Sequence, residues 1–323
     1  MKPDYSPWAT ASRRLIATSV LILAAIAIDP GSSVAVDASG SSAPAASARR
    51  IVSVGGAVTE ILYALGLESS VVGVDTTSLY PPRALAEKPN VGYMRQLSPE
   101  GILGLDPQAI VAIEGSGPQE TMAVLKEANV PIVTVPEDFS ENGLTEKIRT
   151  IAKQMGVESR GACLTQAVDG DFAEVRALRA KIQRPVRVMF VMSLVSGRAM
   201  VAGRKTGADA IIGLAGGVNA IDTYEGYKQV SEEAIVAAKP DVVLAMQRGK
   251  DSVTAESVFT NPAFSLTPAA KTKSFVSMDG LYLLGFGPRT AAAAHDLAGA
   301  LYPELASARD TWKPRVLSAD CRS

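Results

Sequence analysis

The chain has 323 residues, of which 47% are hydrophobic and 20% are charged, and its formal net charge is −1. This length and composition suffice for two domains with well-buried cores. The near-neutral charge, with no basic block, argues against nucleic acid as the main partner.

The N-terminus has the pattern of an export signal. Arg13 and Arg14 precede a mostly apolar run over residues 15–28, and Asp29-Pro30-Gly31 follows this run. An apolar run of about 14 residues fits a signal peptide and is shorter than the ~20 residues that span a membrane. We therefore expect residues 1–48 to be a signal peptide with a Ser/Ala-rich segment, removed on export. An uncleaved anchor is the alternative.

Short apolar strands alternate with helices in the next part of the chain. The pattern predicts strands at 51–54, 71–74, 109–113 and 132–135, and helices at 59–65, 99–105 and 119–128. Each strand is an almost unbroken apolar run, which is typical of a parallel sheet with helices on both faces. We therefore predict an N-terminal α/β lobe over residues 49–157.

A long helical pattern follows the first lobe. Residues 158–183 keep helical periodicity and contain no proline. At ~1.5 Å per residue such a helix is about as long as a domain is high. We predict that one helix over 158–184 links the two lobes, and that so stiff a link lets the cleft open only modestly.

The second lobe, predicted at 185–315, repeats the plan of the first. Strands are predicted at 186–192, 241–246 and 273–277, and helices at 206–214 and 231–238. The segment from Gln96 to Glu100 aligns with the segment from Gln229 to Glu233, and in both a helix and a Pro-initiated strand follow. The expected fold is therefore α/β, with two Rossmann-like lobes, each built on a parallel sheet, joined by one long α-helix.

One loop of the first lobe has the character of a binding loop. Ser98 is a good helix N-cap and Pro99 suits the first helical position. Tyr93 therefore lies in a loop before a helix, with Arg95 two residues further on. A tyrosine packed on its own lobe beside a solvated arginine is the alternative.

Several motifs resemble those of periplasmic haem-binding proteins of bacterial ABC importers. The most specific is Gly92-Tyr93-Met94-Arg95-Gln96-Leu97-Ser98. The other matching segments are Arg50–Gly56 with Thr59-Glu60-Ile61, Val201–Thr206, Gly226–Lys228, Gln247–Gly249 and Leu284–Thr290. The resemblance spans roughly residues 49–303 and implies a monomeric carrier, with no enzymatic activity, that delivers haem to an inner-membrane permease and its ATPase. Ferric siderophore and cobalamin carriers share the fold, so another iron chelate or cobalamin is the alternative cargo.

The resemblance also implies which residues hold the cargo. In the family the tyrosine of this motif is the axial ligand of ferric haem b, which corresponds to Tyr93. A phenolate is a hard ligand suited to Fe(III), and a nearby cation such as Arg95 or Arg248 would favour its ionised form. Arg248 follows the carboxyl end of a predicted strand, so it is the favoured partner for a propionate. Tyr227 is predicted to contact the porphyrin ring, and covering its own lobe is the alternative.

Other potential ligands are less suited to this site. His295, the single histidine, lies in a predicted C-terminal helix, where we expect it to be packed or at the surface. Some family members add a histidine from the second lobe, but residues 193–198 contain none, which argues against a His/Tyr pair and a second stacked haem. The sequence leaves open whether Cys163 and Cys321 form a disulfide. Neither a phosphate-binding loop nor a Gly-x-Ser-x-Gly elbow occurs, so we expect a binding protein and no enzyme.

Two carboxylates are candidates for contact with the permease. Glu60 and Asp209 occupy matching positions in the two lobes. In importers of the kind that this chain resembles, an acidic residue on each lobe is expected to meet an arginine of a permease subunit. The alternative is a pair of ordinary carboxylates that the macrodipole favours at helix N-termini.

Overall fold

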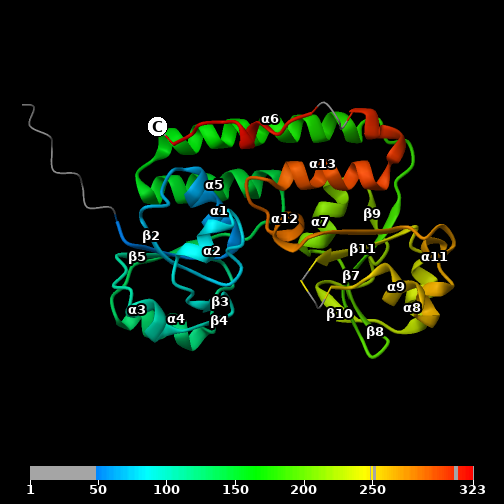
Figure 1. Ribbon diagram of the computed structural model, residues 1–323, viewed down its shortest axis with the longest axis horizontal. Coiled ribbons are helices and arrows are strands. Elements are labelled where there is room, and N and C mark those ends of the chain that lie inside the picture. Colours follow the sequence, from blue (N-terminus) through cyan, green and yellow to red (C-terminus); the bar gives the residue numbers. More distant parts are fainter. Residues whose placement is uncertain (1–48, 248, 250–251, 309–311, 323) are drawn as a thin grey trace, which may run out of the picture. The chain divides into compact units, whose positions relative to one another are not determined.

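The computed structural model describes residues 49–322 except 248, 250–251 and 309–311 (Figure 1). These residues fall within one compact unit, Ala46–Ser323. The predicted signal peptide lies outside the described residues. Across the described part of the chain, no helix combines the length and apolar character needed to cross a membrane.

The first lobe is built on a four-stranded parallel sheet, as predicted. Its strands β1 (Ile51–Val54), β2 (Val71–Val74), β5 (Ala109–Ile113) and β6 (Ile132–Val135) lie in the order β2-β1-β5-β6. Successive side chains of a strand point to opposite faces of the sheet. Val52 and Val54 belong to the buried cluster on one face, together with residues of α3 (Pro99–Leu103) and α4 (Gln119–Glu127). Ile51 belongs to the buried cluster on the opposite face, together with residues of α1 (Gly56–Ala64) and α5 (Glu141–Met155). The short helix α2 (Arg83–Glu87) follows β2.

The second lobe contains a mixed sheet, and this differs from the fully parallel sheet that the sequence predicted. The strands β7 (Arg187–Val195), β8 (Arg198–Ala202), β10 (Tyr227–Gln229), β11 (Val242–Gln247) and β12 (Phe275–Asp279) lie in the order β10-β8-β7-β11-β12, and β9 (Val218–Asn219) pairs with β7. Both β8 and β10 are antiparallel to their neighbours. The cause is the Ser196-Gly197 turn, where both residues have positive φ and fold the chain straight back on itself.

Helices cover both faces of the second sheet as well. These are α7 (Gly207–Leu214), α8 (Glu232–Ala238), α9 (Ala255–Phe259), α10 (Pro262–Ser265), α11 (Pro268–Thr272), α12 (Gly280–Leu284) and α13 (Thr290–Leu301). The long helix α6 (Glu158–Arg179) begins where the sequence predicted and ends a few residues earlier. Helix α5, which lies between the Ser140 N-cap and the Gly156 C-cap, was not predicted from the sequence.

One hydrophobic cluster extends through both lobes. Helix α6 packs along α5 of the first lobe and along α13 of the second, as Figure 1 shows. Side chains from all three helices, for example Ile148, Phe172 and Leu297, belong to a single buried cluster that also contains residues of both sheets. The two lobes therefore share part of their core on the α6 side.

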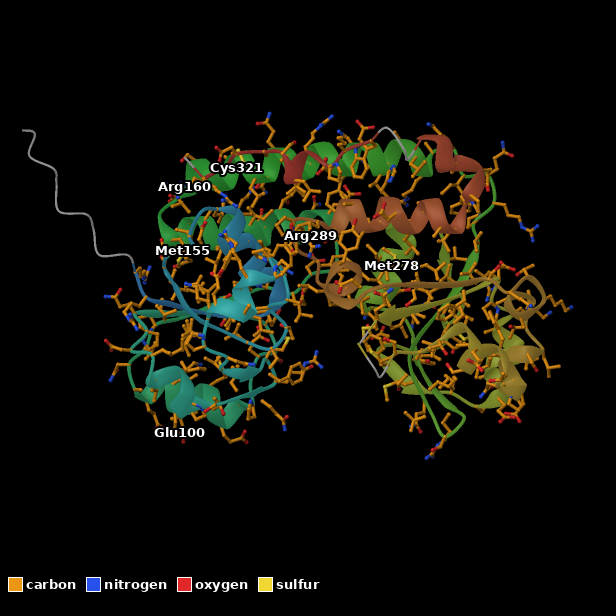
Figure 2. The ribbon with its side chains drawn as sticks, viewed as in Figure 1. Glu100, Met155, Arg160, Met278, Arg289 and Cys321 are labelled. Atoms are coloured by element: carbon orange, nitrogen blue, oxygen red, sulfur yellow. A yellow bond between two sulfur atoms is a disulfide. The ribbon has the colours of Figure 1, made fainter. Side chains whose placement is uncertain are left out.

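The C-terminal residues 312–322, which we call the C-terminal strap, lie along α6. Cys321 forms a disulfide with Cys163 of α6, which answers the question that the sequence left open, and Figure 2 shows Cys321 at the same end of α6 as Arg160. The fully buried Asp171 accepts hydrogen bonds from the backbone N–H groups of Arg315 (2.7 Å) and Val316 (3.0 Å). A covalent bond and a buried carboxylate thus hold the strap on the helix.

Reduction of the disulfide is expected to loosen the strap while the sheets stay folded. The strap has few buried apolar side chains, and such segments open locally at a low free-energy cost once a cross-link is lost. Hydrogen–deuterium exchange with and without dithiothreitol measures this directly. Faster exchange should be confined to residues 312–322 and the part of α6 beneath them. Faster exchange in β1 and β5 would instead show that the disulfide stabilises the whole fold.

Candidate functional site

The predicted binding loop around Tyr93 is a tight hairpin at the carboxyl edge of the first sheet. Strands β3 (Gly92–Tyr93) and β4 (Gln96–Leu97) pair with each other across a two-residue turn. The hairpin is anchored by the N–H of Thr76, just after β2, which donates to Gly92 O (2.9 Å), and by the N–H of Gly117, just after β5, which donates to Met94 O (2.8 Å). This is the edge at which open α/β sheets bind ligands.

Local sequence explains the hairpin's shape. Gly92 has φ +101°, and a Cβ atom at this position would lie 2.7 Å from the carbonyl oxygen of Gln96, so only glycine fits without a shift. The Gly92 N–H is satisfied by Asn90 Oδ1 (2.8 Å). Ser98 accepts a hydrogen bond from Gly101 N–H (3.0 Å), and Pro99 begins α3, which confirms the predicted cap. Tyr93 is thereby held at the hairpin with its side chain 41% exposed.

Gly92→Ala is expected to distort the hairpin and leave the fold intact. The strained backbone costs about 1–3 kcal/mol, and the collision with Gln96 O displaces the turn. We therefore expect whatever binds at Tyr93 to lose affinity about tenfold, equal to ~1.4 kcal/mol. The matched control is Gly156→Ala, because Gly156 also has positive φ but no neighbour within 4 Å of an added Cβ. Equal affinity losses in titrations of the two variants would contradict this explanation.

Tyr227 lies at the edge of the other sheet. It belongs to β10, opposite Ala202 of β8, and its ring packs edge-on against Phe190 with 6.3 Å between centroids. Burial raises the pKa of Tyr227, while hydrogen bonds to Thr206 and to the Ala208 backbone and the charge of Arg95 oppose that rise. The half-buried ring of Tyr227 is the part that a ligand could contact.

Arg95 of the first lobe has an electrostatic effect on Tyr227 of the second lobe. Arg95 is exposed in the turn of the Tyr93 hairpin, and its charge acts on Tyr227 of the second lobe. Figure 1 shows β3 and β4, which flank Arg95, on the side of the first lobe that faces β10 of the second lobe, so the elements that carry Tyr93 and Tyr227 face each other. Among the described residues nothing hydrogen-bonds to the Tyr93 hydroxyl, so this oxygen can take an external partner.

The remaining candidates for the site lie elsewhere or outside the described residues. Arg248, predicted to bind a propionate, and Lys250 are outside the described residues. Arg204 is exposed and lies 3.8 Å from Glu225 of its own lobe, as a surface arginine does. Tyr224 donates its hydroxyl to Val201 O (3.1 Å) and so covers its own lobe.

The histidine is packed, as the sequence predicted. His295 lies on α13, is 4% exposed and stacks on Trp312 of the C-terminal strap, with 4.3 Å between the ring centroids. Its place on α13 and beneath the strap sets it apart from the hairpin that carries Tyr93.

Glu60 is buried, and this corrects the environment that the sequence suggested for it. Helix α1 begins at Gly56, so Glu60 lies in the second turn and is only 5% exposed. Arg289 of the second lobe donates through Nε (2.9 Å) and Nη2 (3.0 Å) to the two carboxylate oxygens, and its backbone N–H donates to Oε1 (3.2 Å). Burial raises the pKa of Glu60, and the hydrogen bonds and charge of Arg289 oppose it. As placed here, the carboxylate has no free face for a partner protein.

Asp209 lies in the first turn of α7 and is half-buried. Its two oxygens accept hydrogen bonds from Lys205 N–H (3.1 Å) and from Asn219 Nδ2 (3.1 Å). These contacts fit the alternative interpretation of a favourable carboxylate at a helix N-terminus. Docking of a permease at Asp209 stays a prediction.

Comparisons with known proteins agree with this arrangement. Residues 51–281 match the periplasmic binding protein family. The structure of the periplasmic heme-binding protein BhuT in complex with two hemes is 38% identical, with a TM-score of 0.76 over 80% of this chain and 99% of that one. The ABC transporter substrate-binding lipoprotein YvrC of Bacillus subtilis is 27% identical over 79% of this chain and 81% of its own length. A vitamin B12-binding protein of Vibrio parahaemolyticus is 28% identical over 60% and 69%. This chain therefore belongs to the periplasmic binding protein family, whose members carry substrates and catalyse no reaction.

Proposed function

We propose that this protein is a haem carrier that binds ferric haem between its two lobes and delivers it to an ABC permease. The observation that carries the proposal is the placement of Tyr93, whose exposed hydroxyl lacks a partner among the described residues and whose hairpin faces Tyr227. The 38% identity to a heme-binding protein over almost its whole length supports the same cargo.

Tyr93 supplies the iron ligand in this proposal. A phenolate oxygen is a hard anionic donor that suits Fe(III), and tyrosine is a known axial ligand of haem iron. The phenol of free tyrosine ionises near pH 10, so the iron's charge and a neighbouring cation must favour the phenolate at neutral pH. Arg95 lies two residues away in the same turn and provides that cation, or pairs with a haem propionate.

Tyr227 provides a contact for the porphyrin ring. Burial raises the pKa of Tyr227, which makes its phenol a less favourable iron ligand. The aromatic ring can instead pack against the flat macrocycle. We propose that Arg248 adds a second cation for a propionate. With no histidine in the β7–β8 turn, one haem with Tyr93 as its protein ligand is the arrangement that we propose.

The route of delivery follows from the family. Periplasmic binding proteins act outside the cytoplasm, which agrees with the Cys163–Cys321 disulfide. We propose that residues 1–48 are removed on export and that the mature monomer docks on a permease driven by an ATPase. Asp209 is the candidate contact that we retain on the second lobe.

A spectroscopic titration tests the cargo. The purified protein is titrated with hemin, with cyanocobalamin and with a ferric siderophore, and visible absorption is followed in each case. We expect saturable binding of hemin, with the charge-transfer bands of high-spin ferric haem bound to a phenolate. Saturable binding of cobalamin or of the siderophore, without a saturable haem band, would show that the chain carries one of these other cargoes.

A further inference from the structure

A loop of the second lobe reaches into the first lobe. Residues 285–289 connect α12 to α13, and within them Phe286 is fully buried and packs edge-on against Phe139, with 5.1 Å between ring centroids. Gly287 lies so close to α1 that an added Cβ would be 3.2 Å from the carboxyl group of Glu60. The absence of a side chain at Gly287 thus allows the two lobes to approach at this point.

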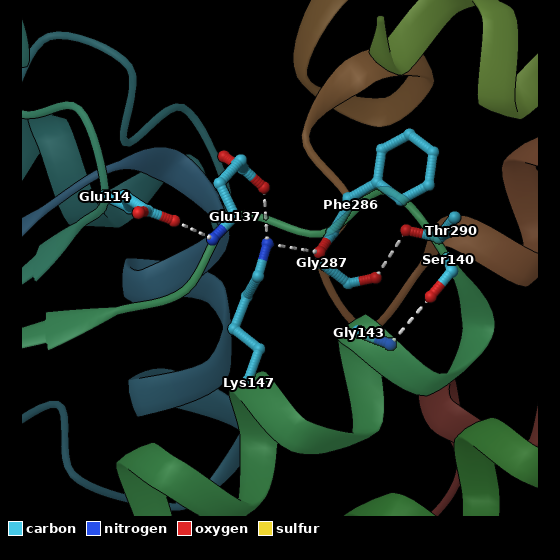
Figure 3. A network of polar contacts seen from close by, with 8 residues as sticks. All are labelled: Glu114, Glu137, Ser140, Gly143, Lys147, Phe286, Gly287 and Thr290. Atoms are coloured by element: carbon cyan, nitrogen blue, oxygen red, sulfur yellow. Dashed lines mark hydrogen bonds and ion pairs between the residues drawn. The ribbon is translucent and has the colours of Figure 1, made fainter. Parts of the chain in front are cut away.

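A buried lysine of the first lobe holds this loop from one side. Lys147 of α5 is fully buried, and its Nζ donates to Glu137 Oε1 (2.8 Å) and to Phe286 O (3.3 Å), as Figure 3 shows. The Glu137 N–H in turn donates to Glu114 Oε2 (3.1 Å). A charge that is removed from water must be paired and hydrogen-bonded to be tolerated. One of the partners that satisfy Lys147 is a backbone carbonyl of the other lobe.

An ion pair holds the same loop at Arg289, three residues after Phe286. Its guanidinium forms the two-pronged contact with Glu60 of α1 and stacks on Tyr80, with 3.5 Å from Cζ to the ring centroid. Two-pronged pairs of this kind fix direction as well as distance, because both N–H groups must align with both oxygens. The loop is therefore held at both of its ends by charges of the first lobe.

The cavity beside Arg289 offers little to a ligand. It is lined by aromatic side chains that include Tyr80 and Trp312. The face of Tyr80 is already covered by Arg289, and Trp312 already stacks on His295. These rings therefore support the ion pair and the strap.

We propose that loop 285–289, clamped by Lys147 and Glu60, is an interlobe latch that sets the angle between the lobes. Helix α6 and the shared part of the core join the lobes along one side. Loop 285–289 adds directed polar contacts with α1 and α5, and these restrain rotation of one lobe against the other. The latch then keeps the Tyr93 hairpin opposite Tyr227. This inference rests on the proposed function and explains how the haem site is held ready before haem arrives.

The test measures the distance between the lobes in the absence of any ligand. Spin labels are attached through an unnatural keto amino acid at the exposed positions Glu120 and Glu232, one on each lobe, so that the native disulfide stays intact. Lys147→Met keeps the length of the side chain and removes the charge. We expect pulsed electron paramagnetic resonance to show a distance distribution that is broader than in the parent protein and has a shifted maximum.

The matched control is Arg149→Met on the same helix. Arg149 forms an exposed ion pair with Glu146 (2.7 Å) that involves one lobe only, so its distribution should equal that of the parent. Glu60→Gln is a milder second variant, because it keeps the shape of the side chain and removes the charge that pairs with Arg289 across the lobes. It decides the matter if Lys147→Met does not fold. A folded Lys147→Met or Glu60→Gln protein with an unchanged distribution would overturn the latch.

Measurement of hemin binding distinguishes failure of the latch proposal from failure of the proposed function. If only about a tenth of the Lys147→Met molecules keep the Tyr93 hairpin opposite Tyr227, the apparent Kd for hemin rises about tenfold. Arg149→Met should leave the Kd unchanged. A parent protein that does not bind hemin would refute the proposed cargo and leave the distance measurement as a valid test of the latch. Altered distances with an unchanged hemin affinity would overturn the claim that the latch readies the site.

Discussion

Tyr93→Phe is expected to weaken hemin binding by at least about 100-fold, or roughly 2.7 kcal/mol. The substitution keeps the ring and removes only the oxygen that is proposed to bind iron. Loss of a partner that merely supports a metal ligand already costs about 10–100-fold in affinity, so loss of the ligand itself should cost at least the upper end of this range. The charge-transfer bands of phenolate-bound ferric haem should disappear as well. Titration of hemin followed by visible absorption measures both quantities.

Tyr224→Phe is the matched control for this experiment. Tyr224 also carries a phenol at the edge of the second sheet, but its hydroxyl donates to Val201 O within its own lobe. Its removal should leave the haem spectrum unchanged. If Tyr93→Phe retained the parent spectrum and affinity, Tyr93 would not be the iron ligand, and the proposed site would have to be abandoned.

Arg289→Met is expected to lower the free energy of unfolding by about 3–5 kcal/mol, because it leaves the Glu60 carboxylate buried without its partner. Glu60 is 5% exposed, and Arg289 supplies all the hydrogen bonds to its two oxygens that the described residues provide. Urea unfolding followed by circular dichroism measures the loss. As a control, Arg83→Met removes the exposed pair with Glu68 and should cost at most about 1 kcal/mol.

The double variant Glu60→Met with Arg289→Met separates the value of the pair from the cost of an orphaned charge. Replacing both partners of a buried ion pair by apolar side chains is often close to neutral, so the double variant should recover most of the stability lost in Arg289→Met. If Arg289→Met cost no more than Arg83→Met, the Glu60 carboxylate would be reaching water, and the buried pair would not hold the loop.

Local signals in the sequence predicted the first lobe and the Tyr93 segment well. The strands of the first sheet are apolar runs bounded by glycine and polar residues, and Ser98-Pro99 is a cap signal that needs no tertiary information. The hairpin at Gly92 also follows from a local requirement, the positive φ of a glycine next to a carbonyl oxygen. The pairing of β3 with β4 was still missed, because two-residue strands leave no periodicity to detect.

Two features were not predicted, one because its partner is distant in sequence and the other because a turn signal was overlooked. The pattern around Glu60 is that of an ordinary helix, and nothing local shows that its partner Arg289 lies 229 residues away. The antiparallel strand β8 was hidden because the apolar run of β7 was interpreted as an isolated parallel strand. Ser196-Gly197 could have revealed the hairpin, since a small polar residue followed by glycine between two apolar runs is a turn signal.

The hydrophobic cluster that extends through both lobes has a consequence for synthesis. The apolar face of α5 is complete once residue 155 has been made, but part of its cover comes from α6. Helix α13, which covers the other end of α6, ends only at Leu301. A growing chain that carries only the first lobe therefore presents Leu144, Ile148 and Ile151 without their final neighbours. Such transiently exposed apolar surface is prone to association, so we expect the growing chain to aggregate more readily until α13 is made.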